Sequence, residues 1–69
     1  MKVAWRSGAI ADLVVWARGD DRVDAILAET GVGNLPSQRV LSRNGFRQTG
    51  TRTDAEDGPV ICWQIATRD

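Results

Sequence analysis

Residues 7–18 carry apolar side chains at helical spacing. The positions, at i, i+3, i+4 and i+7, are Ile10, Leu13, Val14 and Ala17. This spacing gives one apolar stripe, so we predict an amphipathic helix over Ser7–Arg18. Ser7 suits the N-cap of that helix and Gly19 its C-cap. Trp16 lies beside the stripe and would widen it, which places this side chain in the core or in an interface.

The segment Val23–Thr30 (VDAILAET) has a different pattern. Five of its eight residues are apolar, and three of those are branched. It is short for a helix and rich in β-favouring residues, so we predict a strand. The nearly continuous apolar run Ala25–Ala28 predicts that this strand is buried on both faces.

A second helix is predicted to begin at Asn34-Leu35-Pro36. Asn34 is a favoured N-cap, and proline is tolerated in the first turn. The expected core stripe of this helix is Leu35, Val40 and Leu41. Asn44-Gly45 then ends the helix, because this pair readily adopts the left-handed conformation of a helix stop.

The last third of the chain reads as a hairpin. Phe46–Thr53 and Val60–Thr67 favour strands, and the acidic, turn-rich stretch of residues 54–59 joins them. Phe46 and Trp63 are expected core residues. The order is therefore α-β-α-β-β. We predict one α/β (α+β) domain over residues 1–69, with two helices and a three-stranded antiparallel sheet.

Composition excludes several functional classes. The chain has 69 residues, with 9 Lys+Arg against 9 Asp+Glu, so its net charge is zero. No excess of cations is available for nucleic acid or a membrane surface, and 42% hydrophobic content argues against disorder. One cysteine and no histidine exclude an internal disulfide and a Cys/His zinc site. The acidic turn lacks calcium-loop spacing, so we expect no metal.

Neither a membrane span nor a secretory leader is evident in the sequence, so we expect a cytoplasmic protein. The length of the chain also limits the stability that it can reach by folding alone. A domain of this size buries only about 60% of the surface that its unfolded chain exposes. Small domains compensate with disulfides, metals or association. With the first two unsupported here, we expect a homo-oligomer.

The most informative stretch is Asn34-x-x-Ser37-x-x-Val40-Leu41-x-x-x-Gly45-Phe46, preceded by Ala28-Glu29-Thr30. It resembles the C-terminal half of the GNAT superfamily of N-acetyltransferases, in the subgroup that includes the ribosomal-protein N-terminal acetyltransferases. The segment AIADLVVWAR is similar to the helix before the fifth strand of that fold. The resemblance implies that Val60–Thr67 lies between Val23–Thr30 and Phe46–Thr53.

The resemblance also implies a cofactor, acetyl-coenzyme A, and acetyl transfer to an amine in the full family. Asn34 and Ser37 would contact the cofactor, and Arg43 on the same helix would approach its phosphates. Asn34 and Ser37 both fall in the first helical turn, where a cap side chain, free backbone N–H groups and the positive end of the helix dipole suit a polar or anionic ligand.

The chain departs from the family at three places. The Gly-rich pyrophosphate loop should precede the first helix, but that place holds Lys2–Ser7, without glycine until Gly8. A general-acid tyrosine is common seven residues after the asparagine, where this chain has Leu41. Four strands of the acceptor side have no counterpart. We therefore expect a partial or minimal member that binds acetyl-coenzyme A weakly, with no catalytic residue assigned.

The missing half would leave Val23–Thr30 at an edge of the sheet, where an unprotected apolar strand recruits a second chain. The alternative function is a non-catalytic, acetyltransferase-derived assembly or binding module. In that case Asn34 is only a helix cap.

Two further side chains and one cluster of arginines have two readings each. Glu29 is either a general base or, as we expect, a solvated carboxylate at a strand end. Cys62 is either a nucleophile or, as we expect, a buried inert thiol. The cluster of arginines is either an RNA site or, as we expect, a solvated face. That cluster comprises Arg39, Arg43, Arg47 and Arg52.

Overall fold

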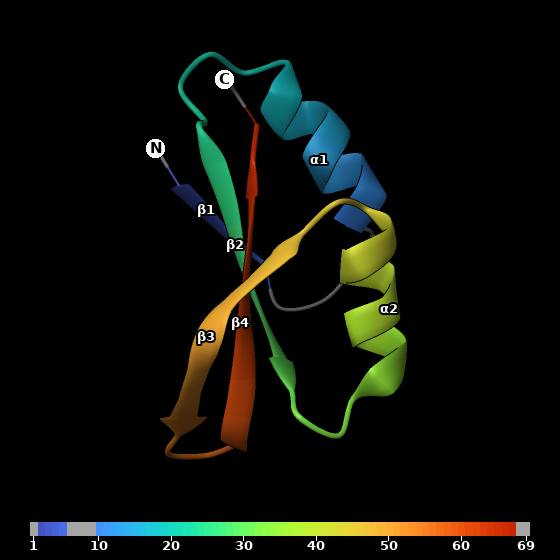
Figure 1. The fold of residues 1–69 in the computed structure, drawn as a ribbon. Helices are drawn as coiled ribbons and strands as arrows, with labels where there is room; N and C mark the ends of the chain where they lie inside the picture. Colours follow the sequence, from blue (N-terminus) through green and yellow to red (C-terminus); the bar gives the residue numbers. More distant parts are fainter. Residues whose placement is uncertain (1, 6–9, 68–69) are drawn as a thin grey trace.

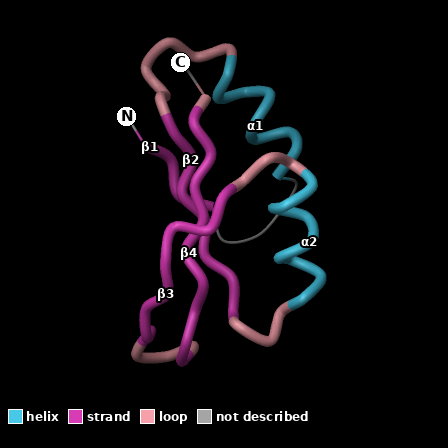
Figure 2. Tube along the Cα trace, in the orientation of Figure 1, coloured by secondary structure: helices cyan, strands magenta, loops and turns pink. Residues whose placement is uncertain are grey.

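The computed structural model describes residues 2–5 and 10–67. Its elements in chain order are β1 (Lys2–Trp5), α1 (Ile10–Arg18), β2 (Ala25–Gly31), α2 (Leu35–Arg43), β3 (Arg47–Asp54) and β4 (Gly58–Ala66). The four strands form one sheet, and both helices lie on the same side of it (Figures 1 and 2). The predicted fold class and its α-β-α-β-β order are confirmed, with one strand added in front.

The strands are arranged in the order β1-β2-β4-β3. Strand β4 runs antiparallel to both of its neighbours, with Glu29 opposite Cys62 on one side and Gly50 opposite Cys62 on the other. The last strand therefore lies between the two others of the antiparallel sheet, in the order that the family resemblance implies. A register shift between Gln48 and Gly50 marks a bulge in β3.

Strand β1 corrects two expectations. Lys2–Trp5, expected at the place of a phosphate loop, pairs in parallel with Ala25–Ala28 of β2. The rest of that expected loop lies outside the described residues. Because β1 occupies the outer side of β2, β2 is an interior strand and not an edge. The expectation of association through an exposed β2 thus loses its structural basis.

Helix α1 packs with the predicted stripe. Ile10, Val14 and Ala17 are buried in the core, and Leu13 packs against it. The N-cap predicted at Ser7 lies outside the described residues. Trp16 is half exposed, so it is not a core residue.

Burial alternates along β2 from Ile26 onward, whereas Ala25 before it is buried as well. Ile26 and Ala28 belong to the core beneath the helices, whereas Leu27 between them is exposed. The expected burial of both faces is wrong at Leu27. Helices cover only one face of the sheet, so successive side chains meet the core and the open face in turn.

Helix α2 departs most from its predicted stripe. Leu41 is fully buried, but Leu35 and Val40 are exposed. Successive helical residues turn by about 100°, so these three positions do not share one face. Phe46 and Trp63 are buried, as predicted. Between Leu41 and Phe46, Gly45 makes the expected left-handed stop at φ +88°.

The β3–β4 hairpin closes through its acidic turn. The carboxylate oxygen Oδ1 of Asp54 accepts hydrogen bonds from the backbone N–H groups of Glu56, at 2.8 Å, and Asp57, at 3.1 Å. These bonds favour the charged form and hold the pKa of Asp54 below its ordinary value. The acidic stretch is thus a turn, as predicted, that Asp54 caps.

Candidate functional site

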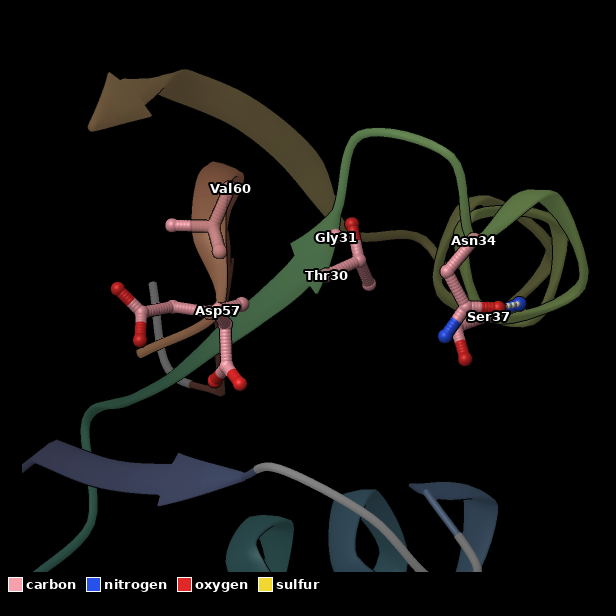
Figure 3. Close-up of a pocket in the computed structure, with 7 residues that line it drawn as sticks. Thr30, Gly31, Asn34, Ser37, Asp57 and Val60 are labelled. Carbon is pink, nitrogen blue, oxygen red and sulfur yellow. Dashed lines mark hydrogen bonds between the residues drawn. The ribbon is translucent and has the colours of Figure 1, made fainter. Parts of the chain in front are cut away.

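A hollow of about 300 Å³ lies where β2 ends and α2 begins. It is lined by Glu29, Thr30, Gly31, Asn34, Ser37, Asp57 and Val60. Figure 3 shows Asn34 and Ser37 on the first turn of α2, with Asp57 and Val60 across the opening. Two of the three residues marked by the family resemblance, Asn34 and Ser37, thus share one site with the end of β2.

Hydrogen bonds fix the connection between β2 and α2. The side-chain amide of Gln38 donates to the carbonyl oxygens of Gly31, at 3.1 Å, and Val32, at 2.8 Å. The backbone N–H of Val32 donates to the carbonyl of Pro59 at 3.3 Å, which ties the loop to the start of β4. The wall of the hollow is therefore held from both sides. Gln38 is a residue that the sequence reasoning missed.

The first turn of α2 has no spare backbone donor. The N–H of Leu35 donates to the carbonyl of Gly33 at 3.1 Å, and Pro36 has no N–H. The N–H of Ser37 donates to Asn34 Oδ1 at 3.3 Å, so Asn34 is the predicted N-cap. The next N–H, of Gln38, donates to the carbonyl of Asn34 at 3.2 Å. The free N–H groups expected here for an anionic ligand are used within the chain.

The hollow therefore offers neutral polar groups instead. Asn34 and Ser37 line it, and Asn34 Oδ1 is engaged in the cap. Thr30 is buried and accepts a hydrogen bond from Trp63 Nε1 at 2.9 Å. Glu29 and Asp57 add carboxylates, and none of the described lining residues is a cation. This composition suits an uncharged ligand with amide groups and opposes a phosphate.

Glu29 is part of an ion pair that the sequence did not reveal. Both of its carboxylate oxygens accept from the guanidinium of Arg52 on β3, which also lies 3.3 Å from Asp54. The hydrogen bond to Glu29 raises the pKa of Arg52 above its ordinary value. Cys62 Sγ lies 3.9 Å from Glu29, so this half-buried thiol belongs to the same group. Glu29, expected to be a solvated carboxylate, is thus paired although partly exposed, and Cys62, expected to be buried, is only half-buried.

Arg43 lies apart from this site. It is exposed in the last turn of α2 and is not among the residues that line the hollow. Arg39 and Arg47 are exposed as well, while the fourth arginine of the expected solvated face, Arg52, is engaged by Glu29. The structure thus unites Asn34 and Ser37 and leaves Arg43 outside.

The described part of the chain contains neither a metal-binding cluster nor a membrane-spanning helix. In residues 2–5 and 10–67, no group of three or more His, Cys, Asp or Glu side chains is placed to hold a metal ion. Neither described helix is long and apolar enough to span a membrane. Comparison of the whole chain with known protein families, with curated proteins and with solved structures finds no match.

Proposed function

We propose that this chain binds acetyl-coenzyme A as the cofactor-binding part of a GNAT-like acetyltransferase fold. One observation carries the proposal. Asn34 and Ser37, the two positions marked by the family pattern, line the same hollow as Thr30 and Gly31 at the end of β2. The order β2-β4-β3 also agrees with the arrangement that the resemblance implies.

The volume and the lining groups of the hollow determine which part of the cofactor it can bind. Its volume of about 300 Å³ is at the lower end for small-molecule sites, so it holds only one end of a molecule of this size. The Asn34 amide and the Ser37 hydroxyl match the amides of the pantetheine arm. The carboxylates of Glu29 and Asp57 disfavour the phosphates. The pantetheine arm therefore occupies the hollow, and the phosphates lie outside it.

The same residues argue against acetyl transfer by this chain alone. Transfer needs a base to deprotonate the amine and an acid to protonate the departing thiolate. The position of the family's tyrosine holds Leu41, which is fully buried in the core. Glu29, the one carboxylate on β2 at the hollow, has both oxygens engaged by Arg52. We therefore propose binding without turnover.

A second candidate is a non-catalytic assembly module that keeps the fold. The observation that favours it is the first turn of α2, where capping and Pro36 leave no backbone donor for a ligand. For either function we propose the cytoplasm as the compartment, because a lone thiol such as Cys62 stays reduced there.

Titration followed by NMR chemical shifts tests the proposal. Acetyl-coenzyme A should bind with a dissociation constant in the high micromolar range, roughly −5 to −6 kcal/mol. Shifts should concentrate at Thr30, Gly31, Asn34 and Ser37. Acetyl-pantetheine, which lacks the nucleotide, should bind within about threefold of the full cofactor, because the phosphates gain nothing in the hollow.

Two conservative variants separate binding from folding. Ser37→Ala removes one hydroxyl, and Asn34→Asp keeps an N-cap oxygen while replacing the amide donor with a charge. Both should fold and both should weaken cofactor binding. Shifts confined to other residues, or sub-micromolar affinity, would contradict the proposed site. Absence of any shift at millimolar cofactor would favour the assembly module.

A further inference from the structure

The exposed apolar side chains of this small protein are unevenly distributed. Among the described residues, five of the six large exposed ones lie on the helices or in the loop that enters α2. On α1, Val15 is 73% exposed and Trp16 49%. On α2, Leu35 is 53% exposed and Val40 40%. The sixth, Leu27, faces the helix-free side of the sheet.

Each helix also presents a charged side chain beside its exposed apolar residues, and the two charges have opposite signs. On α1, exposed Asp12 precedes Val15 and Trp16 by three and four positions, so the three share one face. On α2, exposed Arg39 follows Leu35 by four positions, so these two share one face, whereas Val40 lies on another. One helix thus presents an acid beside Val15 and Trp16, and the other presents a cation beside Leu35.

We propose that this helical side docks on a second copy of the chain, with α1 against the partner's α2 and α2 against the partner's α1. A two-fold axis satisfies both contacts at once and closes the assembly at a dimer. The surface consists of Asp12, Val15, Trp16, Leu35 and Arg39, and is called the helical surface below. Asp12 of one copy faces the partner's Arg39, and the reverse pair is equivalent by symmetry.

One observation favours a second copy of this chain as the partner, and another favours docking through the helices over pairing of sheet edges. The acid and the cation needed for complementary contacts are both present in this one chain, on separate helices. Strand β3, an outer strand of the sheet, is polar and exposed along nearly its whole length and carries a bulge, two features that oppose edge-to-edge pairing. The helical surface shares no residue with the hollow at Asn34 and Ser37, so the proposal stands independently of cofactor binding.

Sedimentation velocity from about 1 to 200 µM measures the assembly, and the unmodified chain should be mainly dimeric at the upper end. Trp16→Ser should weaken the dimer roughly a hundredfold, because a central aromatic is lost at two equivalent contacts. Leu27→Ser is the matched control: it removes an exposed apolar side chain from the opposite side of the sheet and should leave the dimer unchanged. Circular dichroism verifies that each variant is folded.

Charge exchange tests the pairing of α1 with α2. Asp12→Arg alone and Arg39→Asp alone should each weaken the dimer, since each places like charges together twice. An equimolar mixture of the two variants should recover dimers, and so should the double variant. This test relies on exposed positions and decides the matter even if Trp16→Ser fails to fold.

Three results would overturn the proposal. A monomer throughout the concentration range would exclude self-association, and the helical surface would then bind a different protein. A dimer that Trp16→Ser does not weaken would place the interface elsewhere. Failure of the mixed charge variants to associate better than either alone would exclude the pairing of α1 with α2.

Discussion

Helices α1 and α2 have the same length and lie on the same side of the sheet, yet they are held differently. Both contain nine residues. Helix α1 buries three of them, whereas α2 buries only Leu41. In return, α2 is closed at both ends by asparagine: Asn34 caps its start, and the Asn44 side chain donates to the carbonyl of Val40 at 2.8 Å. The first helix is held by burial, and the second by local hydrogen bonds around one anchor.

The two modes of attachment contribute different amounts to the free energy of unfolding. Burying one large apolar side chain contributes about 1.5–3 kcal/mol, whereas an N-cap contributes about 1 kcal/mol. Helix α2 should therefore loosen more readily than α1. Its attachment to the core depends on Leu41 and on Phe46, whose backbone N–H donates to the carbonyl of Leu41 at 3.0 Å.

The largest effect is expected from Phe46→Ala. Losing a buried aromatic should lower the free energy of unfolding by about 3–5 kcal/mol, which exceeds what a domain of this size can spare. Urea or thermal unfolding followed by circular dichroism should show no cooperative transition. Val40→Ala, on the exposed side of α2, is the matched control and should change stability by less than about 0.5 kcal/mol. A cooperatively folded Phe46→Ala variant would show that α2 has another anchor.

A smaller loss is expected from Val14→Ala in α1. The removed methyl groups and the cavity left behind should lower the free energy of unfolding by about 2 kcal/mol. The neighbouring Val15 is exposed, so Val15→Ala should change it by less than about 0.5 kcal/mol. Denaturation of both variants at a concentration where the chain is monomeric gives the comparison. Equal effects at the two positions would contradict the burial pattern of α1.

The smallest effect is expected from Asn34→Ala. Loss of the N-cap should lower the free energy of unfolding by about 1 kcal/mol, and amide hydrogen exchange should accelerate in α2 more than in α1. Asn34→Asp keeps a capping oxygen and should lose little. Uniform acceleration across both helices would mean that α2 is not the more loosely held of the two.

Sequence reasoning succeeded where the determinant is local. The stripe of α1, the cap at Asn34 and the stop at Gly45 each depend on a few neighbouring residues, and each lies where it was predicted. The pairing of Asn34 with Ser37 in one hollow also follows from their spacing within one helical turn. These features need no knowledge of what the helix packs against.

It failed where the determinant is distant. Strand β1 forms because it pairs with Ala25–Ala28 of β2. Its four residues are too few to show a hydrophobic periodicity from which a strand could be predicted. Leu35 and Val40 look like core residues, but their burial depends on a covering layer that this chain does not place over them. The contact of Glu29 with Arg52 joins residues 23 positions apart and becomes visible only with the strand register.

That contact has a consequence for how the sheet is aligned. Glu29 is on β2 and Arg52 on β3, and the two strands are separated by β4. A slip of one residue in either ladder would turn one partner to the opposite face of the sheet. The ion pair therefore forms only when the β2–β4 and β4–β3 ladders are both in register. One contact between two side chains thus depends on the alignment of all three strands.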